Sequence, residues 1–214
     1  MYCEKLFVTD GKVENHKEGV PFEYYVNLFK DLDPAEASAR TGAAFDGAAF
    51  TLCLMGTWYR IAWPEYAISS EDENAFALKA LPPQTFLLRY LLEGKKVEAK
   101  GEWKTFREMP WGELYIQPFT GRCLTRAAFT FGTRVQKFRE ACEKMGAKLV
   151  SHGDAGFLFD LIGGYQMQIL VWEGDDEFPP NAQILYSDNF AEGFAAEDRV
   201  VAGDILISVI KSFM

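Results

Sequence analysis

Histidine and cysteine are scarce in this sequence, which has two histidines and four cysteines among 214 residues. Two histidines nearly exclude a multi-histidine metal site or a histidine-based catalytic triad. The cysteines are far apart, without the CxxC spacing that zinc ribbons and iron–sulfur clusters require; they are Cys3, Cys53, Cys123 and Cys142. We therefore expect free thiols, no cofactor, and a colourless protein that purifies without stoichiometric iron.

Long hydrophobic runs and basic tracts are also missing. The longest stretch without a charged side chain, residues 47–59, has 13 residues, which is too few to cross a bilayer as a helix. The first ten residues lack the apolar core of a signal peptide. Thirty-one acidic and 22 basic residues give a net charge of −9, with no basic run that could follow a phosphate backbone. We therefore expect a cytoplasmic protein that binds neither nucleic acid nor membrane.

Apolar residues are abundant: 49% of the chain is hydrophobic and 15% is aromatic. A chain of this length buries roughly 70% of the surface that its unfolded form exposes, which is enough for one large core. No internal repeat or linker-like change of composition divides the sequence. We expect a single domain over residues 1–214, with residues 1–19 forming a peripheral N-terminal segment.

Helical periodicity and capping signals recur along the chain. Pro21 suits the first position of a helix, and Asp33-Pro34 suits the start of a second one that ends at Gly42. Thr133-Arg134-Val135-Gln136 has the pattern of a capping box. The expected helices cover residues 21–32, 33–42, 85–92, 119–131, 135–145 and 197–213, although residues 205–210 could also form a strand.

Two dipeptides mark hairpins in the sequence. Gly163-Gly164 suits the positive φ values of a type I′ turn, and because the runs 157–162 and 165–172 are apolar, we expect this hairpin at the core of a sheet. Gly56-Thr57 separates a second pair, residues 49–54 and 58–63. Further strands are expected at residues 103–109, 113–117 and 182–186. The predicted fold class is α+β, with helices packed on a largely antiparallel sheet.

An acidic loop joins two of the expected strands. Its carboxylates occupy four of five positions, at Glu173, Asp175, Asp176 and Glu177. Such an oxygen cluster suits a hard divalent cation, which Asp175, Asp176 and Glu177 would ligate, although the spacing matches no EF-hand. The alternative is a solvated acidic turn, stiffened by Pro179-Pro180 and anchored by Trp172 and Phe178.

Three arginines lie in hydrophobic or aromatic segments, where an unpaired guanidinium is costly. These residues, Arg60, Arg107 and Arg122, could bind an anionic ligand. They could also pair structurally with the acidic loop or with Glu102, Glu108 or Glu113. Because the loop carboxylates repel one another, we expect at least one of these guanidinium groups within about 4 Å of them.

Several segments together resemble one known family. They are Asp33-Pro34 before a short helix, Gly56-Thr57-Trp58-Tyr59-Arg60, residues 87–92, residues 101–110, residues 172–181, and Glu197-Asp198 before the last helix. The tryptophan-glutamate-glycine-acidic-acidic block that begins at Trp172 is the most specific of them. On these motifs the chain is similar to domain-of-unknown-function family 3786 over nearly its whole length.

The resemblance implies an uncharacterised protein of a kind found largely in anaerobic bacteria and archaea. Some relatives are described as iron–sulfur proteins because a cysteine-rich module is attached, and this chain has no such module. Relatives often carry an aspartate and a histidine where this chain has Ser187 and Glu192, so a metal or acid–base site formed there would be lost or altered. Ala196 replaces a threonine that tends to cap the last helix, which should weaken that cap by about 1 kcal/mol.

Abundant aromatic residues beside a few arginines can line an apolar cavity that has charged anchors. We therefore expect an accessory domain that binds an unidentified small molecule or protein, with Arg60, Arg107, Arg122, Trp172 and the loop carboxylates as its candidate contacts. The first alternative is an enzyme that uses a divalent metal held by residues 173–177. The second is a structural oligomer.

Overall fold

The computed structural model describes residues 8–9, 12–13, 16–73 and 75–214, so that Cys3 and much of the expected peripheral segment lie outside it. Its strands are β1 (Val8–Thr9), β2 (Lys12–Val13), β3 (Ala44–Phe45), β4 (Ala49–Leu54), β5 (Thr57–Ala62), β6 (Ala67–Ser69), β7 (Trp103–Thr105), β8 (Lys148–Val150), β9 (Ala155–Ile162), β10 (Tyr165–Trp172) and β11 (Asn181–Ser187). Its helices are α1 (His16–Lys30), α2 (Pro34–Thr41), α3 (Leu81–Glu93), α4 (Gly112–Phe119), α5 (Arg126–Phe131), α6 (Val135–Lys144), α7 (Phe190–Gly193) and α8 (Ala196–Ser212).

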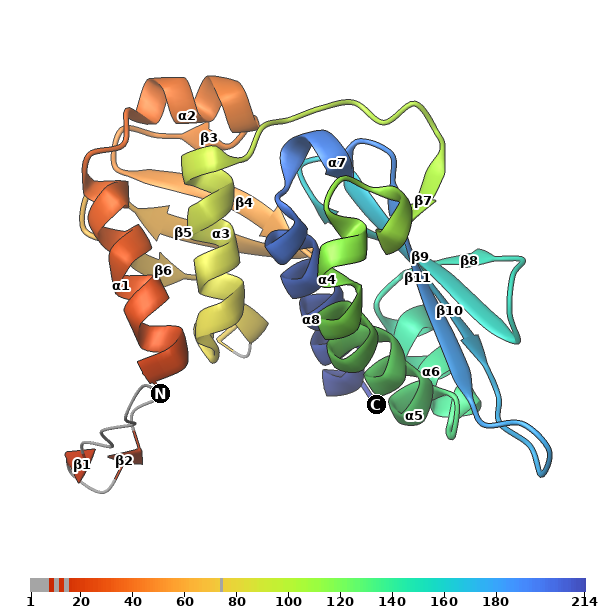
Figure 1. Ribbon diagram of the computed structural model, residues 1–214. Coiled ribbons are helices and arrows are strands. Elements are labelled where there is room, and N and C mark those ends of the chain that lie inside the picture. The colour runs from red at the N-terminus through yellow and green to blue at the C-terminus, as the bar shows by residue number, and fades with distance from the viewer. Residues whose placement is uncertain (1–7, 10–11, 14–15, 74) are drawn as a thin grey trace.

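The predicted α+β class is confirmed, with two main antiparallel sheets in place of one (Figure 1). The four-stranded sheet has the order β3-β4-β5-β6, and the five-stranded sheet has the order β7-β11-β10-β9-β8. Helices α1 and α3 lie side by side over the first sheet, and α8 lies between α3 and the helices α4 and α5 (Figure 1). Within the described residues, no helix is long and apolar enough to cross a bilayer.

The predicted hairpin at Gly163-Gly164 is confirmed. These glycines have φ values of 55° and 91°, and the strands on either side, β9 and β10, pair antiparallel. Strand β10 is the middle strand of its sheet, and Tyr165, Met167 and Ile169 along it are completely buried. Two apolar strands joined by a turn that needs positive φ twice are a purely local signal, which explains why the sequence was sufficient here.

The hairpin of β4 and β5 is also present, but its turn lies one residue earlier than expected. Met55 and Gly56 have φ values of 50° and 79°, so they occupy the turn, and Thr57 begins β5. The backbone N–H of Met55 donates to the carbonyl of Leu161 at 2.8 Å. This bond fixes the tip of the first hairpin against the second sheet.

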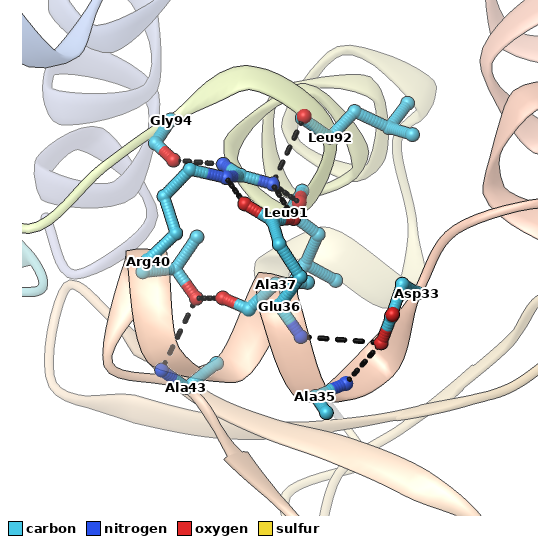
Figure 2. Close-up of polar contacts among 10 residues, drawn as sticks. Asp33, Ala35, Glu36, Ala37, Arg40, Ala43, Leu91, Leu92 and Gly94 are labelled. Atoms are coloured by element: carbon cyan, nitrogen blue, oxygen red, sulfur yellow. Dashed lines mark hydrogen bonds and ion pairs between the residues drawn. The ribbon is translucent and has the colours of Figure 1, made fainter.

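Helix α1 begins before Pro21, which therefore lies inside the helix and not at its first position. Helix α2 has the predicted Asp33 cap: one carboxylate oxygen accepts from the N–H groups of Ala35 and Glu36 at 2.9 and 3.2 Å (Figure 2). At its other end, Gly42 has a φ of 74°, which is the left-handed conformation expected of a C-terminal glycine.

Arg40 connects α2 to the C-terminal end of α3. Figure 2 shows its guanidinium donating to the carbonyl oxygens of Leu91, Leu92 and Gly94, while its Nε donates to Glu36 at 2.7 Å. The last carbonyls of a helix have no partner within the helix. A side chain from the neighbouring helix therefore supplies the partners here.

The strand expected at residues 113–117 is wrong, because these residues belong to α4. Tyr115, Ile116 and Phe119 have the spacing of one helical face, and the Phe119 ring stacks on Phe106 with the ring centroids 4.2 Å apart. The helix continues through a π-helical turn, Thr120–Thr125, into α5. Burial of this aromatic face decided between the helix and the strand.

The expected capping box at Thr133 is wrong too. Its hydroxyl donates to the carbonyl of Phe129 at 2.9 Å, and the N-cap residue of α6 is Arg134, whose side chain makes no capping hydrogen bond. The last helix, by contrast, is helical throughout residues 205–210, and Leu206, Ile207 and Ile210 in it are completely buried. Because α8 packs between other helices, it is apolar on more than one face.

Candidate functional site

Charged residues of α3 and α8 meet between two neighbouring cavities. The first, which we name the Arg199 cavity, has a volume of about 370 Å³ and is lined by Arg89, Glu93, Gly94, Pro110, Trp111, residues 191–196, Asp198 and Arg199. The second, the Tyr25 cavity, has a volume of about 450 Å³ and is lined by Pro21, Tyr25, Pro82, Thr85, Phe86, Arg89, Arg122, Glu197, Asp198 and Val201. Arg89 and Asp198 thus belong to both walls.

Arg89 and Asp198 form a two-pronged ion pair between α3 and α8. The Nη2 of Arg89 donates to one carboxylate oxygen at 2.9 Å, and its Nε lies 2.6 Å from the other. The side chains are only 16% and 8% exposed. Burial raises the pKa of Asp198, and the charge of Arg89 offsets this in part. The pair therefore fixes the charged wall that separates the cavities.

The aromatic ring of Tyr25 packs against the guanidinium group of Arg89. The guanidinium carbon lies 5.0 Å from the centroid of the tyrosine ring, and Nη1 donates to the tyrosine hydroxyl. Glu93, one turn further along α3, places a carboxylate oxygen 3.6 Å from Nη2. Arg89 is therefore held by three side chains and has a single orientation.

Arg199 is buried beside this pair and is only 1% exposed. Its Nε donates to the carbonyl of Ala195 at 3.3 Å, and its Nη2 donates to the carbonyl of Pro110 at 2.5 Å. The guanidinium carbon also lies 5.7 Å from the ring centroid of Phe106. Nη1 has no hydrogen-bond partner among the residues that the structure describes, and burial lowers the pKa of Arg199.

Two backbone features complete the Arg199 cavity. Trp111, which is 73% exposed, has a φ of 63°, a conformation that is strained for a bulky side chain. Helix α8 begins after Ala195, whose side chain provides no cap. The sequence predicted that Ala196 would occupy the cap position of this helix. In the structure the cap is Ala195, one residue earlier, and it too provides no side-chain acceptor for the first N–H groups of the helix.

The predicted arginines do not meet the acidic loop. Arg60 pairs with Asp46, Arg107 pairs with Glu113 at 3.2 Å, and Arg122 pairs with Asp204 at 3.3 Å. Among the described side chains, none of the three guanidinium groups is within ion-pairing distance of the loop, so that expectation is wrong. The alternative pairing of Arg107 with Glu113 is confirmed. Of these three arginines, Arg122 lines the Tyr25 cavity.

Carboxylate oxygens in and beside the acidic loop accept hydrogen bonds from its backbone N–H groups. One carboxylate oxygen of Asp175 accepts from the N–H groups of Glu177 and Phe178 at 2.9 and 2.7 Å, and these bonds lower its pKa. Asp154 accepts from the N–H of Glu173 at 2.8 Å. The loop lies at the far end of the β10–β11 hairpin (Figure 1), where Phe178 is 68% exposed and Trp172 is 36% exposed. It contributes nothing to either cavity wall.

No group of three or more histidine, cysteine, aspartate or glutamate side chains converges on a metal position within the residues that the structure describes. The metal site predicted at Asp175, Asp176 and Glu177 therefore stays a prediction without geometric support. Cys123 and Cys142 are buried free thiols, and Cys53 is a half-buried one. The prediction that the cysteines are free thiols is therefore confirmed for these three residues.

Residues 33–209 match the family described as Domain of unknown function (DUF3786). The chain belongs to this family. No curated protein and no solved structure matches the chain significantly. The charged residues of the Arg199 cavity lie inside the part that matches DUF3786, whereas Tyr25 precedes it. Family membership gives no activity, so function has to be argued from the site itself.

Sequence reasoning did not select Arg89, Asp198 or Arg199 as site residues. Two signals in the sequence could have done so. Arg89 is the only charged residue in the apolar run 86–92, and Asp198-Arg199 directly precedes the apolar part of the last helix. Charges embedded in apolar helices need a partner or a ligand.

Proposed function

We propose that this chain is a ligand-binding domain whose site is the Arg199 cavity. One observation carries the proposal: Asp198 and Arg199 are the two fully buried charged residues among the described side chains, and both line this cavity. Burying charge is costly, and a core has no need of it. Charged groups placed in a cavity wall are instead typical of binding sites, where they orient a ligand.

The Tyr25 cavity shares Asp198 but does not include Arg199. A larger one, about 500 Å³, lies near the C-terminus, but the charged residues in its wall, Asp72 and Lys79, are exposed. The metal-enzyme and structural-oligomer alternatives have no comparable observation among the described residues. Binding without catalysis is favoured because the buried carboxylate in the wall, Asp198, is already held by Arg89, while the other two carboxylates, Glu93 and Glu192, are exposed.

A thermal-shift screen with a library of metabolite-sized compounds tests this function. Ligands that bind only the folded state raise the melting temperature in proportion to their occupancy. Ala195→Leu should abolish these shifts, because Ala195 is an exposed residue in the wall and a larger side chain there fills the cavity. Ala99→Leu is the matched control, since Ala99 is exposed and lies outside both cavities.

The expected result is one or more compounds that stabilise the wild type and the Ala99→Leu variant but not the Ala195→Leu variant. Hits that persist in Ala195→Leu would assign binding to another surface and refute this site. A screen without any hit would argue against a small-molecule-binding function.

A further inference from the structure

Arg199 forms no ion pair with any residue that the structure describes, although the charge of Asp198 acts on it from beyond ion-pairing distance. Its two bonded nitrogens donate to neutral carbonyl oxygens, of Ala195 and Pro110, and the third, Nη1, has no partner. Among the described residues, no carboxylate lies within ion-pairing distance of it, although the nearby Arg89 has one in Asp198. A buried guanidinium with an unpaired N–H group can donate a charge-assisted hydrogen bond to an anion.

The start of α8 adds to the positive potential at the same place. Helix α8 has 17 residues, and its N-terminal N–H groups receive no hydrogen bond acceptor from the side chain of Ala195. Such N–H groups and the helix dipole attract negative charge. Asp198 lies in this first turn, but its carboxylate is bound to Arg89, and Glu197 lines the Tyr25 cavity instead.

We propose that the Arg199 cavity binds a small monocarboxylic acid, with the carboxylate toward the guanidinium of Arg199 and the start of α8, and with an apolar remainder against Phe194 and Trp111. This inference rests on the function proposed above and adds the class of ligand. Phe194 is buried in the cavity wall, and Trp111 is largely exposed at its edge. An indole at this position provides a flat apolar surface for the rest of the ligand.

The rim of the cavity decides between a monoanion and a dianion. Glu93 and Glu192 line the cavity and are both exposed, so their carboxylates lie at its rim. The charged side chains in the wall are two arginines, of which Arg89 is paired with Asp198 and Glu93 and Arg199 is in no ion pair, and three carboxylates, those of Glu93, Glu192 and Asp198. Repulsion therefore works against phosphate or a dicarboxylate more strongly than against a monocarboxylate.

Phenylacetate and the neutral phenylacetamide are a matched pair of probes, because they share the ring and differ in charge. Calorimetric titration of the wild type should show saturable binding of phenylacetate and at least about tenfold weaker binding of phenylacetamide, as expected when a charge-assisted hydrogen bond is lost. Inorganic phosphate, as the third probe, should bind more weakly than phenylacetate.

Two variants assign the binding to the proposed residues. Arg199→Lys keeps the charge but loses the forked donor, so it should weaken phenylacetate binding at least about tenfold while leaving phenylacetamide unchanged. Because Arg199 is buried, that variant could fail to fold, and an exposed position serves as the second probe. Glu192→Gln removes a rim charge and should tighten the binding of phenylacetate but not of phenylacetamide.

The following outcomes would overturn the assignment of a monocarboxylate ligand to this cavity. Equal affinity for the acid and the amide, with binding still lost in Ala195→Leu, would overturn the carboxylate assignment and leave the ligand-binding function intact. Tighter binding of phosphate than of phenylacetate would also overturn it. Absence of phenylacetate binding at millimolar concentrations, or an affinity unchanged by Glu192→Gln, would refute the inference, and the library screen would then judge the ligand-binding function separately.

Discussion

Arg40 holds the C-terminal end of α3 against α2, and its replacement by alanine should destabilise the protein substantially. The guanidinium donates to the carbonyls of Leu91 and Leu92 at 2.9 and 3.0 Å and also to that of Gly94 (Figure 2). Leu91 is completely buried, so its carbonyl would lose a charged donor that water replaces poorly. That loss costs about 1–3 kcal/mol, and loss of the bonds to the half-buried Leu92 and the buried Gly94 adds about 1 kcal/mol in total.

The expected loss of unfolding free energy in Arg40→Ala is therefore about 2–4 kcal/mol, measured by equilibrium denaturation in urea with an unchanged m-value. For a domain of this size it corresponds to a fall in melting temperature of roughly 5–15 °C. Arg40→Lys keeps a cation near the helix end but cannot reach three carbonyls, so it should lose about half as much.

Two controls separate carbonyl capping from ion pairing. Glu36→Gln removes only the partly exposed i,i+4 partner of Arg40 and should cost about 0.3–0.5 kcal/mol. Arg107→Ala removes an arginine from an exposed pair, with side chains 61% and 73% exposed, and should cost less than about 1 kcal/mol. If Arg40→Ala costs no more than these two variants, the capping argument is refuted.

Three further predictions follow from the described geometry. Burial raises the pKa of the Cys123 thiol to about 12, so native protein should resist iodoacetamide at this residue and react only in urea, as peptide mass mapping would show; equal reaction in both states would contradict this. A hydrogen bond from Arg60, with two backbone N–H groups, lowers the pKa of Asp46 to about 2. Its contribution to stability is therefore complete above the unfolded pKa of about 4 and lost as the pH falls toward 2, and an NMR titration midpoint near 4 would count against the pairing. Gly163→Ala should lose more unfolding free energy, about 2–4 kcal/mol, than Gly164→Ala, at about 1 kcal/mol, because a Cβ at position 163 would lie 2.2 Å from a buried tyrosine hydroxyl, whereas nothing lies within 4 Å at position 164. Equal losses in urea denaturation would show that the strain of positive φ alone sets the cost.

Local signals determined several elements from the sequence alone. The central hairpin follows from two apolar runs around Gly163-Gly164, and the start of α2 follows from Asp33 with a proline at the next position. In each case the residues that decide the structure lie within a few positions of one another, so their chemistry acts before any tertiary contact forms.

Tertiary packing decided the elements with ambiguous patterns. Residues 113–117 have no strong periodicity, and they are helical because Phe119 stacks on Phe106 in the core. Thr133 could have capped α6, but its hydroxyl donates instead to the carbonyl of Phe129 in the preceding helix. A short segment with two acceptable conformations takes the one that buries more apolar surface or satisfies more polar groups.

The candidate site shows most clearly which features the local sequence determined and which features only the tertiary structure decided. The sequence contains arginines and carboxylates in apolar surroundings, and it predicted that such charges need partners. Which charges pair depends on the fold: Arg89 reaches Asp198 across 109 positions, while Arg60 on β5 reaches Asp46 in the turn between β3 and β4. Among the described residues, the fold places no carboxylate within ion-pairing distance of the buried Arg199. Whether a buried charge has a partner depends on the tertiary arrangement, which no local sequence pattern specifies.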